Sequence, residues 1–278
     1  KLQPGHYLEY DINTNEFEIN EYWNLLDSYN DIELDQNEET VKKKIEDLLI
    51  DSCKLRMVSD VPVGVFLSGG YDSSLVTAIL SKHQKERIKT FTIGFHEKDF
   101  NEANHAKKIA DYLGTDHTEY YCTKDDMLDL FDKLPTYFDE PFADSSSIPT
   151  ILVSKIAQKK VSVVLSADGG DEVFFGYSKY FALDKISKNK LKKYKFLINL
   201  FTVKNIEFLN RFMPNKYRQK NIKDKFNKFK SALESKNNNE MFLNSSSVIT
   251  NTDVRKILKP NCFKSFNQTN FKWFDKLN

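Results

Sequence analysis

One stretch, residues 61–76, constrains the fold more than any other part of the chain. It reads Val-Pro-Val-Gly-Val-Phe-Leu-Ser-Gly-Gly-Tyr-Asp-Ser-Ser-Leu-Val. An apolar, β-rich run that meets Ser-Gly-Gly predicts a buried strand, a tight turn and the start of a helix. Two adjacent glycines let successive backbone N–H groups point into one concavity, and the helix N-terminus adds its unpaired amides and positive dipole. The stretch therefore predicts a site for an anion such as phosphate.

The side chains of this loop refine that prediction. Ser68, Ser73 and Ser74 offer hydroxyl donors. No lysine follows the glycines, as one does in the Gly-Lys-Ser/Thr loop of kinases and GTPases. Asp72 stands there instead, and a carboxylate beside phosphates is favourable mainly when a magnesium ion lies between them. The loop favours a pyrophosphate held with a metal, and the alternative is a structural strand-turn-helix corner with serine caps.

Strands and helices alternate through the middle of the predicted structure. The strands are expected at residues 61–66, 88–95, 117–122 and 161–165, and the helices at 41–53, after the glycine loop, and at 101–113, 124–134 and 145–159. This order predicts an α/β fold, a parallel sheet with helices on both faces, followed by a helical C-terminal part. Ligands bind such sheets at the carboxyl ends of the strands. We expect the ends of the first, second and fourth strands, at Ser68, Gly94 and Ser166, to face one site.

A second polar cluster follows the fourth strand, with the sequence Ser-Ala-Asp-Gly-Gly-Asp-Glu at residues 166–172. Its carboxylates, Asp168, Asp171 and Glu172, repel one another unless a cation or a cationic substrate lies among them. The alternative is a solvated acidic turn that caps the next helix. Beside the phosphate site, the cluster favours shared magnesium.

The two ends of the chain differ from this middle part. Residues 1–25 predict a hairpin of two short alternating strands around Asn13-Thr14-Asn15, which needs another surface to pack on. The sequence from Tyr177 onward predicts lysine-rich helices. Its interleaved lysines and aromatic residues favour solvated helical faces, and a nucleic-acid surface is the alternative.

Composition excludes several classes of protein. The formal net charge of +1 gives no overall basic excess of the kind that nucleic-acid-binding proteins carry. No apolar run approaches the roughly 18 residues that indicate a membrane span. The three cysteines show no Cys-Xaa-Xaa-Cys spacing, which favours a reducing compartment. We expect a cytoplasmic protein, and the start at Lys1 suggests a cut inside a longer one.

These motifs carry a resemblance to a known family. Ser-Gly-Gly-Xaa-Asp-Ser at 68–73 resembles the PP-loop of ATP pyrophosphatases, which split ATP between its α and β phosphates. The chain as a whole resembles the synthetase domain of glutamine-hydrolysing asparagine synthetases, the class II amidotransferases. The motifs that match lie at residues 60–74, 91–95, 113–115, 139–146 and 168–172. Residues 1–25 resemble the tail of the family's N-terminal glutaminase domain, and 26–278 its synthetase domain, truncated at the C-terminal end.

The resemblance implies a role for each matching residue. The residues that would hold the pyrophosphate and its Mg²⁺ are Ser68, Gly69, Gly70, Asp72 and Ser73. Those that would contact the adenosine part of ATP are Leu67, Ile93, Ser166 and Ala167. Asp171 would be a second magnesium or pyrophosphate carboxylate, and Asp168 would assist the attack of ammonia. The chain departs from the pattern at Ala167 and Phe175, where the family usually has Gly.

The resemblance also implies an activity. A carboxylate substrate, aspartate by default, would be amidated through an acyl-adenylate with ammonia from a glutaminase domain, releasing AMP and pyrophosphate. A sugar uronic acid fits the same motifs. A PP-loop enzyme that modifies RNA and an inactive nucleotide-binding module are the rival hypotheses. Homodimers are frequent in the family. The sequence contains neither an N-terminal nucleophilic cysteine nor the family's later Asp-Arg-Xaa-Ser-Met-Ala segment and lysine, so we expect this piece alone to be incomplete.

Overall fold

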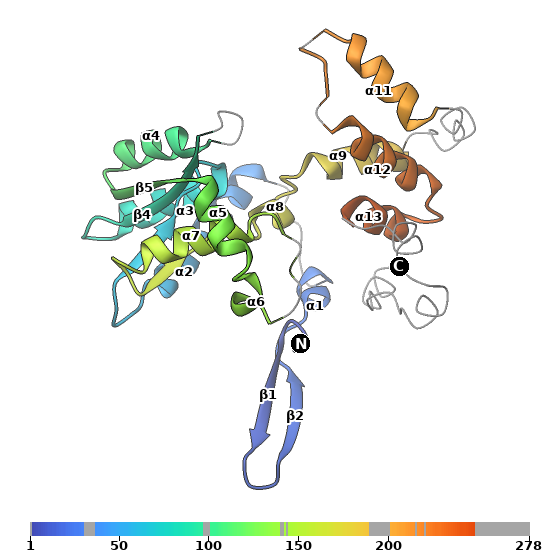
Figure 1. The fold of residues 1–278 in the computed structure, drawn as a ribbon. Coiled ribbons are helices and arrows are strands. Elements are labelled where there is room, and N and C mark those ends of the chain that lie inside the picture. Colours follow the sequence, from blue (N-terminus) through green and yellow to red (C-terminus); the bar gives the residue numbers. More distant parts are fainter. Residues whose placement is uncertain are drawn as a thin grey trace. The chain divides into compact units, whose positions relative to one another are not determined.

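The computed structural model describes residues 2–30, 37–96, 101–139, 142, 144–188, 201–214, 216–219 and 221–247. The chain divides into two compact units, Lys1–Ala167 and Asp168–Asn278 (Figure 1). No helix in the described part of the chain combines the length and the apolar character needed to cross a membrane.

The first unit begins with the predicted hairpin. Strands β1 (His6–Asp11) and β2 (Glu16–Glu21) pair antiparallel around the expected asparagine turn. The register places Leu8 opposite Ile19 and Tyr10 opposite Phe17, so four apolar side chains share one face. All four are exposed. A short helix, α1 (Leu25–Asn30), follows.

The parallel sheet of the first unit confirms the predicted α/β fold. Its strands are β3 (Val63–Phe66), β4 (Lys89–Phe95), β5 (Asp116–Cys122) and β6 (Val163–Leu165). They lie in the order β5-β4-β3-β6, and every neighbouring pair is parallel. The chain moves from β3 outward to β5 and then returns to the other side of β3. The direction of strand order therefore reverses at β3, the place where such sheets bind ligands.

Helices cover both faces of this sheet, and the side chains of β3 alternate between them. The helices of one face are α2 (Glu38–Arg56), α3 (Tyr71–His83) and α4 (Ala103–Leu113); those of the other are α5 (Lys124–Phe131), α6 (Leu134–Tyr137) and α7 (Ser147–Ala157) (Figure 1). Val65 packs against α2 and α3, and Leu67 against α4. Phe66 packs on the opposite face against α7.

The helix predicted at residues 124–134 is wrong in its extent. Helix α5 ends at Phe131, and α6 begins separately at Leu134. Pro135 lies in the first turn of α6, where it needs no N–H partner, whereas in the interior of a longer helix it would remove a hydrogen bond and clash with the preceding turn.

The second unit is helical, as predicted for the sequence from Tyr177 onward. Its helices are α8 (Gly170–Val173), α9 (Ser178–Lys188), α11 (Val203–Phe212), α12 (Ile222–Glu234) and α13 (Asn238–Ser246). Its core joins α9, α12 and α13 through Leu183, Ile186, Ala232, Leu233 and Met241. Two stretches lie outside the described residues: 189–200, which belongs to the segment with interleaved lysines and aromatic residues, and 248–278.

Candidate active site

The loop between β3 and α3 has the geometry that its glycines predict. Gly69 has φ +86°, a conformation that glycine adopts without steric cost. A Cβ atom at this position would also lie 2.8 Å from the backbone N of Ala106 in α4. Gly69 is therefore required twice, by its backbone conformation and by the close approach of α4.

Two serine hydroxyls hold the loop together from inside. Ser73 is buried, and its Oγ accepts from the N–H of Ser68 at 3.2 Å and lies 2.9 Å from the Ser68 Oγ. The Ser68 Oγ in turn accepts from the N–H of Gly70 at 3.3 Å. The three residues form a connected set of hydrogen bonds, which fixes the curl of the backbone before any ligand binds.

Helix α3 begins directly at this curl. Gly70 is its N-cap residue and supplies no side-chain cap, so the first amides of the helix are left for another acceptor. Asp72 lies in the first turn and is half-buried. Uncapped amides and the helix dipole favour an anion here.

The flanking strands bring further predicted residues to the same edge of the sheet. Phe66 pairs with Phe91, so Ile93 lies level with Ser68 when the register is extended by two residues. Val65 pairs with Leu165, which places Ser166 and Ala167 beyond the same strand end. The structure therefore brings those residues of the first unit that are predicted to bind ATP to one edge of the sheet.

Leu67 differs from the other predicted nucleotide residues. Its side chain is 1% exposed and packs against Ala106 and Ala110. Its N–H donates to the carbonyl of Phe91 at 3.0 Å, and its carbonyl accepts from the hydroxyl of Thr92. The structure gives Leu67 the role of fixing the loop to β4, and its contact with adenosine stays a prediction.

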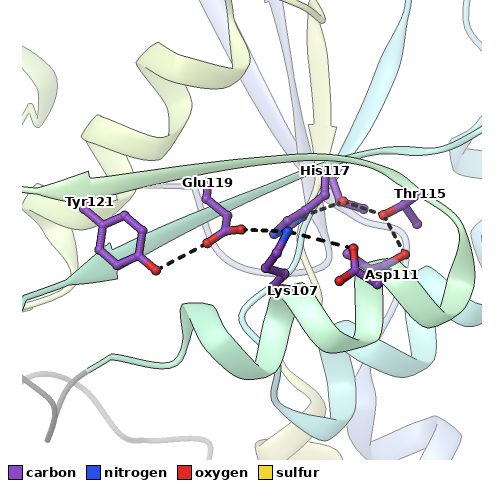
Figure 2. A network of polar contacts seen from close by, with 8 residues as sticks. Lys107, Asp111, Thr115, His117, Glu119 and Tyr121 are labelled. Carbon is purple, nitrogen blue, oxygen red and sulfur yellow. Dashed lines mark hydrogen bonds and ion pairs between the residues drawn. The ribbon is translucent and has the colours of Figure 1, made fainter.

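A polar network that the sequence analysis missed holds α4 against the sheet (Figure 2). Lys107 of α4 lies 3.5 Å from the Glu119 carboxylate of β5, which also accepts from the hydroxyl of Tyr121 at 3.4 Å. His117 Nδ1 lies 2.9 Å from the Thr90 hydroxyl, and its Nε2 is buried without a partner among the described residues. Because α4 forms the wall beside Gly69, this network fixes one side of the loop.

Burial decides the charge state of the histidine in this network. Desolvation lowers the pKa of His117 below its ordinary value of 6.5, Glu119 and Asp111 act in the opposite direction, and Lys107 lowers it further. The folded protein therefore favours the neutral imidazole. No motif marks these residues; the only signal in the sequence was polar side chains at inward positions of β4 and β5.

The carboxylates of the second predicted cluster belong to the second unit, whereas Ser166 and Ala167 belong to the first. Asp168 is exposed, Gly169 has φ +94°, and Asp171 is half-buried in the single turn of α8. The hydroxyl of Tyr177 donates to the Glu172 carboxylate at 2.8 Å, and this bond raises the pKa of Tyr177 to about 12. The acidic turn is therefore tied to a residue that was not among the predicted site residues.

Part of a further motif, residues 139–146, is also described. Glu140, Pro141 and Ala143 lie outside the described residues. Asp144 accepts from the backbone N–H and the hydroxyl of Ser146 at 2.8 and 2.7 Å, and these bonds lower its pKa. Asp144 thus orders the approach to α7.

A pocket of about 570 Å³ lies on the α7 face of the first unit. It is lined by Phe66, Tyr137, Phe138, Thr150, Ile151, Ser154, Lys155, Gln158, Val161, Ser162 and Val164. None of these is a predicted site residue. The candidate phosphate site lies instead at the carboxyl edge of the sheet, at the uncapped start of α3.

The donor set fits a metal that arrives with a nucleotide. Within the described ranges, no three His, Cys, Asp or Glu side chains gather to hold a metal ion by themselves. Magnesium usually keeps several waters and takes one or two carboxylates together with substrate phosphates. A single carboxylate, Asp72, beside uncapped amides is compatible with that arrangement.

Comparison with known proteins decides the family. The sequence model of the family described as asparagine synthase matches residues 44–260. This chain belongs to the asparagine synthase family. A Methanocaldococcus jannaschii protein named as a putative glutamine-hydrolysing asparagine synthetase is 39% identical over 243 residues, covering 81% of this chain and 46% of its own length. Asparagine synthetase (glutamine-hydrolysing) 1 of Bacillus subtilis is 39% identical over 143 residues, 51% of this chain and 22% of its own.

This member of the asparagine synthase family therefore spans less than half the length of those relatives. Solved structures also match it, among them two NAD synthetases. The NH3-dependent NAD synthetase of Campylobacter jejuni covers 78% of this chain and 97% of its own, with 17% identity and a TM-score of 0.37. The glutamine-dependent NAD+ synthetase of Acinetobacter baumannii, solved with ADP, covers 97% and 48%, with 18% identity and a TM-score of 0.38. The family assignment rests on the sequence relatives.

Proposed function

We propose that the whole protein amidates a carboxylic acid at the expense of ATP, through an acyl-adenylate. The observation that carries the proposal is the loop at residues 68–73, whose preformed curl and uncapped helix start lie where the strand order reverses, in a chain of the asparagine synthase family. Aspartate is the substrate we propose first, and a sugar uronic acid is the second candidate because the same motifs accommodate it.

Two steps make up the proposed reaction. A carboxylate oxygen attacks the α-phosphorus of ATP, and the bond from that phosphorus to the bridging oxygen breaks, so pyrophosphate leaves. Ammonia then attacks the acyl carbon, loses a proton, and AMP leaves with the electrons of the acyl–oxygen bond. Asp168 is the proposed acceptor of that proton.

The loop supplies the stabilisation that the first step needs. Negative charge grows on the leaving pyrophosphate, and the uncapped amides of residues 71–73 at the start of α3 are the proposed donors, held in place by the serine hydroxyl network, so that they cost no reorganisation during the reaction. Asp72 and Asp171 are the proposed carboxylates for magnesium. When bound, that ion neutralises phosphate charge as a Lewis acid. Ile93, Ser166 and Ala167 are the proposed contacts for adenosine.

ATP–pyrophosphate exchange tests this proposal. The whole protein is incubated with magnesium, labelled pyrophosphate, and aspartate or one of a panel of uronic acids. We expect exchange that depends on one acid and that falls by about 100-fold in Asp72→Ala, which loses its proposed metal ligand. No exchange with any acid, despite measurable ATP binding, would overturn adenylate formation and favour an inactive nucleotide-binding module.

We also propose that residues 1–25 form the tail of a glutaminase domain that supplies the ammonia, and that 26–278 belong to the synthetase domain. The apolar face of the hairpin supports this, because Leu8, Tyr10, Phe17 and Ile19 are 47%, 53%, 64% and 47% exposed and need a covering surface.

A charge placed on either face of the hairpin tests the domain proposal. In the whole protein, Leu8→Asp should lower the free energy of unfolding by about 2 kcal/mol, since it places a charge against the covering domain. Glu9→Lys, on the opposite face, is the control and should have little effect. Equal effects of the two substitutions, measured by urea unfolding, would contradict the proposal.

A further inference from the structure

The chain turns back on itself directly after Asp171. Phe175 has φ +57°, and the N–H of Gly176 then donates to the carbonyl of Asp171 at 2.9 Å. The segment 171–176 is thus a closed loop around the single turn of α8. Its closure sets where the Asp171 side chain can lie.

Gly176 lies directly against the Asp171 carboxylate. A Cβ atom added at Gly176 would overlap Oδ1, lie 2.8 Å from Cγ and 3.1 Å from the Asp171 Cα. Any side chain at residue 176 would therefore displace this carboxylate. The glycine is needed here because the backbone of residue 176 forms one wall of the position that the carboxylate takes.

An aromatic cluster holds the next part of the loop. Tyr177 donates to Glu172 at 2.8 Å, and its ring lies 5.6 Å from that of Tyr180. The ring of Phe175 also meets Tyr180, edge to face, at 5.6 Å. Phe175 and Tyr177 are therefore both anchored on Tyr180 of α9.

Helix α13 completes the cluster. Phe242 stacks on Tyr180 with ring centroids 6.2 Å apart. The ammonium of Lys179 lies 4.7, 5.4 and 5.9 Å from the ring centroids of Tyr177, Tyr180 and Phe242. Its Nζ donates to the Ser246 hydroxyl at 3.5 Å. Phe242 itself packs on the core that joins α9, α12 and α13. The acidic turn is thereby connected to the hydrophobic core of the second unit.

We propose that Gly176, Tyr177 and Phe242 are positioning residues, which hold the Asp171 carboxylate in the orientation that magnesium-bound pyrophosphate requires. The proposal rests on the role given to Asp171 in the proposed function. Tyr177 acts through Glu172, Gly176 through direct contact with Asp171, and Phe242 through Tyr180. Carboxylates that bind metals are held by such outer partners, and loss of one typically lowers metal affinity about 10–100-fold.

The first measurement is metal affinity, with Mn²⁺ as the probe in place of Mg²⁺. Binding of Mn²⁺ to the whole protein with saturating ATP is followed by electron paramagnetic resonance. We expect Tyr177→Phe, which removes one hydroxyl, and Phe242→Ala to weaken Mn²⁺ binding about 10-fold. Gly176→Ala should weaken it as much as Asp171→Ala. Two controls, Tyr217→Phe and Phe212→Ala, change exposed aromatic residues of the same unit and should bind as the parent does.

The second measurement is amide hydrogen exchange of residues 171–177 without nucleotide or metal. Tyr177→Phe should speed exchange at the Gly176 amide and leave α12 protected, whereas general unfolding would speed both. Parent-like Mn²⁺ affinity in Tyr177→Phe and Gly176→Ala, beside a large loss in Asp171→Ala, would overturn the positioning proposal. If Asp171→Ala binds Mn²⁺ normally, the proposed metal role of Asp171 is wrong. Unchanged hydrogen exchange at the Gly176 amide in Tyr177→Phe would show that the Tyr177 hydroxyl does not hold the turn, and this would overturn the positioning role of Tyr177 separately.

Discussion

The glycine loop of the first unit and the acidic turn of the second both contain a positive-φ glycine, yet they are held in different ways. Gly69 lies against α4, and a Cβ there would meet the Ala106 backbone at 2.8 Å. At Gly169 a Cβ would meet nothing within 4 Å. Close packing of the Gly69 backbone against α4 supports the glycine loop in addition to its serine hydroxyls. The acidic turn has a backbone hydrogen bond from Gly176 to Asp171, but its contacts beyond the turn come from side chains, chiefly Tyr177 and its aromatic neighbours.

This difference has a physical consequence for each region. Backbone packing between a strand, a loop and two helices leaves the glycine loop few other positions, because both of its ends are locked into secondary structure. A turn held by a hydroxyl and ring contacts has separable supports, so single side chains can be removed without unfolding it. We expect substitutions in the glycine loop to affect stability and activity together, and those around the acidic turn to affect mainly metal affinity.

The largest expected effect comes from Gly69→Ala compared with Gly169→Ala. Gly69→Ala combines a strained φ with a clash against α4, so it should lower the free energy of unfolding by about 2–4 kcal/mol and ATP–pyrophosphate exchange by about 100-fold. Gly169→Ala carries only the cost of its φ, about 1–2 kcal/mol. Urea unfolding measures the free energy of unfolding of each variant, and the ATP–pyrophosphate exchange assay measures its activity. Equal losses of stability and activity in the two variants would contradict the difference between the two glycines.

Ser73→Ala should have the next largest effect. It removes the acceptor for the N–H of Ser68 and the contact with the Ser68 hydroxyl, which should cost about 2 kcal/mol of unfolding free energy. Ser74→Ala is the matched control: its exposed hydroxyl donates to the carbonyl of Gly70, so a change within about 0.5 kcal/mol is expected. If urea unfolding gives Ser73→Ala the same free energy of unfolding as the parent, the hydroxyl network does not stabilise the loop.

A smaller effect should appear in the pH dependence of stability. Burial depresses the pKa of His117 in the folded state, so the unfolded chain takes up a proton first as the pH falls. This contribution to stability is present above pH 6.5, the ordinary pKa of histidine, and declines as the pH falls from there through the lower folded pKa.

His117→Asn tests this pH effect because it keeps a polar atom near Thr90 and removes the titration. Its unfolding free energy should change less between pH 8 and pH 5 than that of the parent, as measured by urea unfolding at each pH. Identical slopes for the two proteins would contradict the role of His117.

The smallest expected effect is that of Phe175→Gly. Glycine would relieve about 1 kcal/mol of positive-φ strain but lose an aromatic pair with Tyr180 worth about 0.5–1.5 kcal/mol. The two changes nearly cancel, so the unfolding free energy should stay within about 1 kcal/mol of the parent. Phe174→Gly, at a residue with φ −102°, relieves no strain and should be destabilising. A large loss in Phe175→Gly would show that the ring matters more than the backbone.

Much of the fold followed from local patterns. The hairpin, the four strands of the parallel sheet and the end of α4 at Gly114 lie where periodicity and turn residues predicted them. The split between α5 and α6 was missed, because an apolar pattern continued past Phe131 while the chain could not remain one helix. The supports of the site were missed as well. Thr92, His117 and Tyr177 were not among the predicted site residues, and each acts through a residue distant from it or on another element.

The sequence by itself determined the curl at residues 68–73, because a strand, two glycines and a helix start within one short stretch leave the backbone little choice. It also determined the family, through motifs in a fixed order. Only the tertiary structure decided that α4 closes against Gly69, that Leu67 is buried beneath the loop, and that Phe242 of α13 stacks on Tyr180, the ring that Phe175 and Tyr177 also meet. These contacts join residues far apart in the chain, and packing of whole elements, which no local pattern encodes, brings them together.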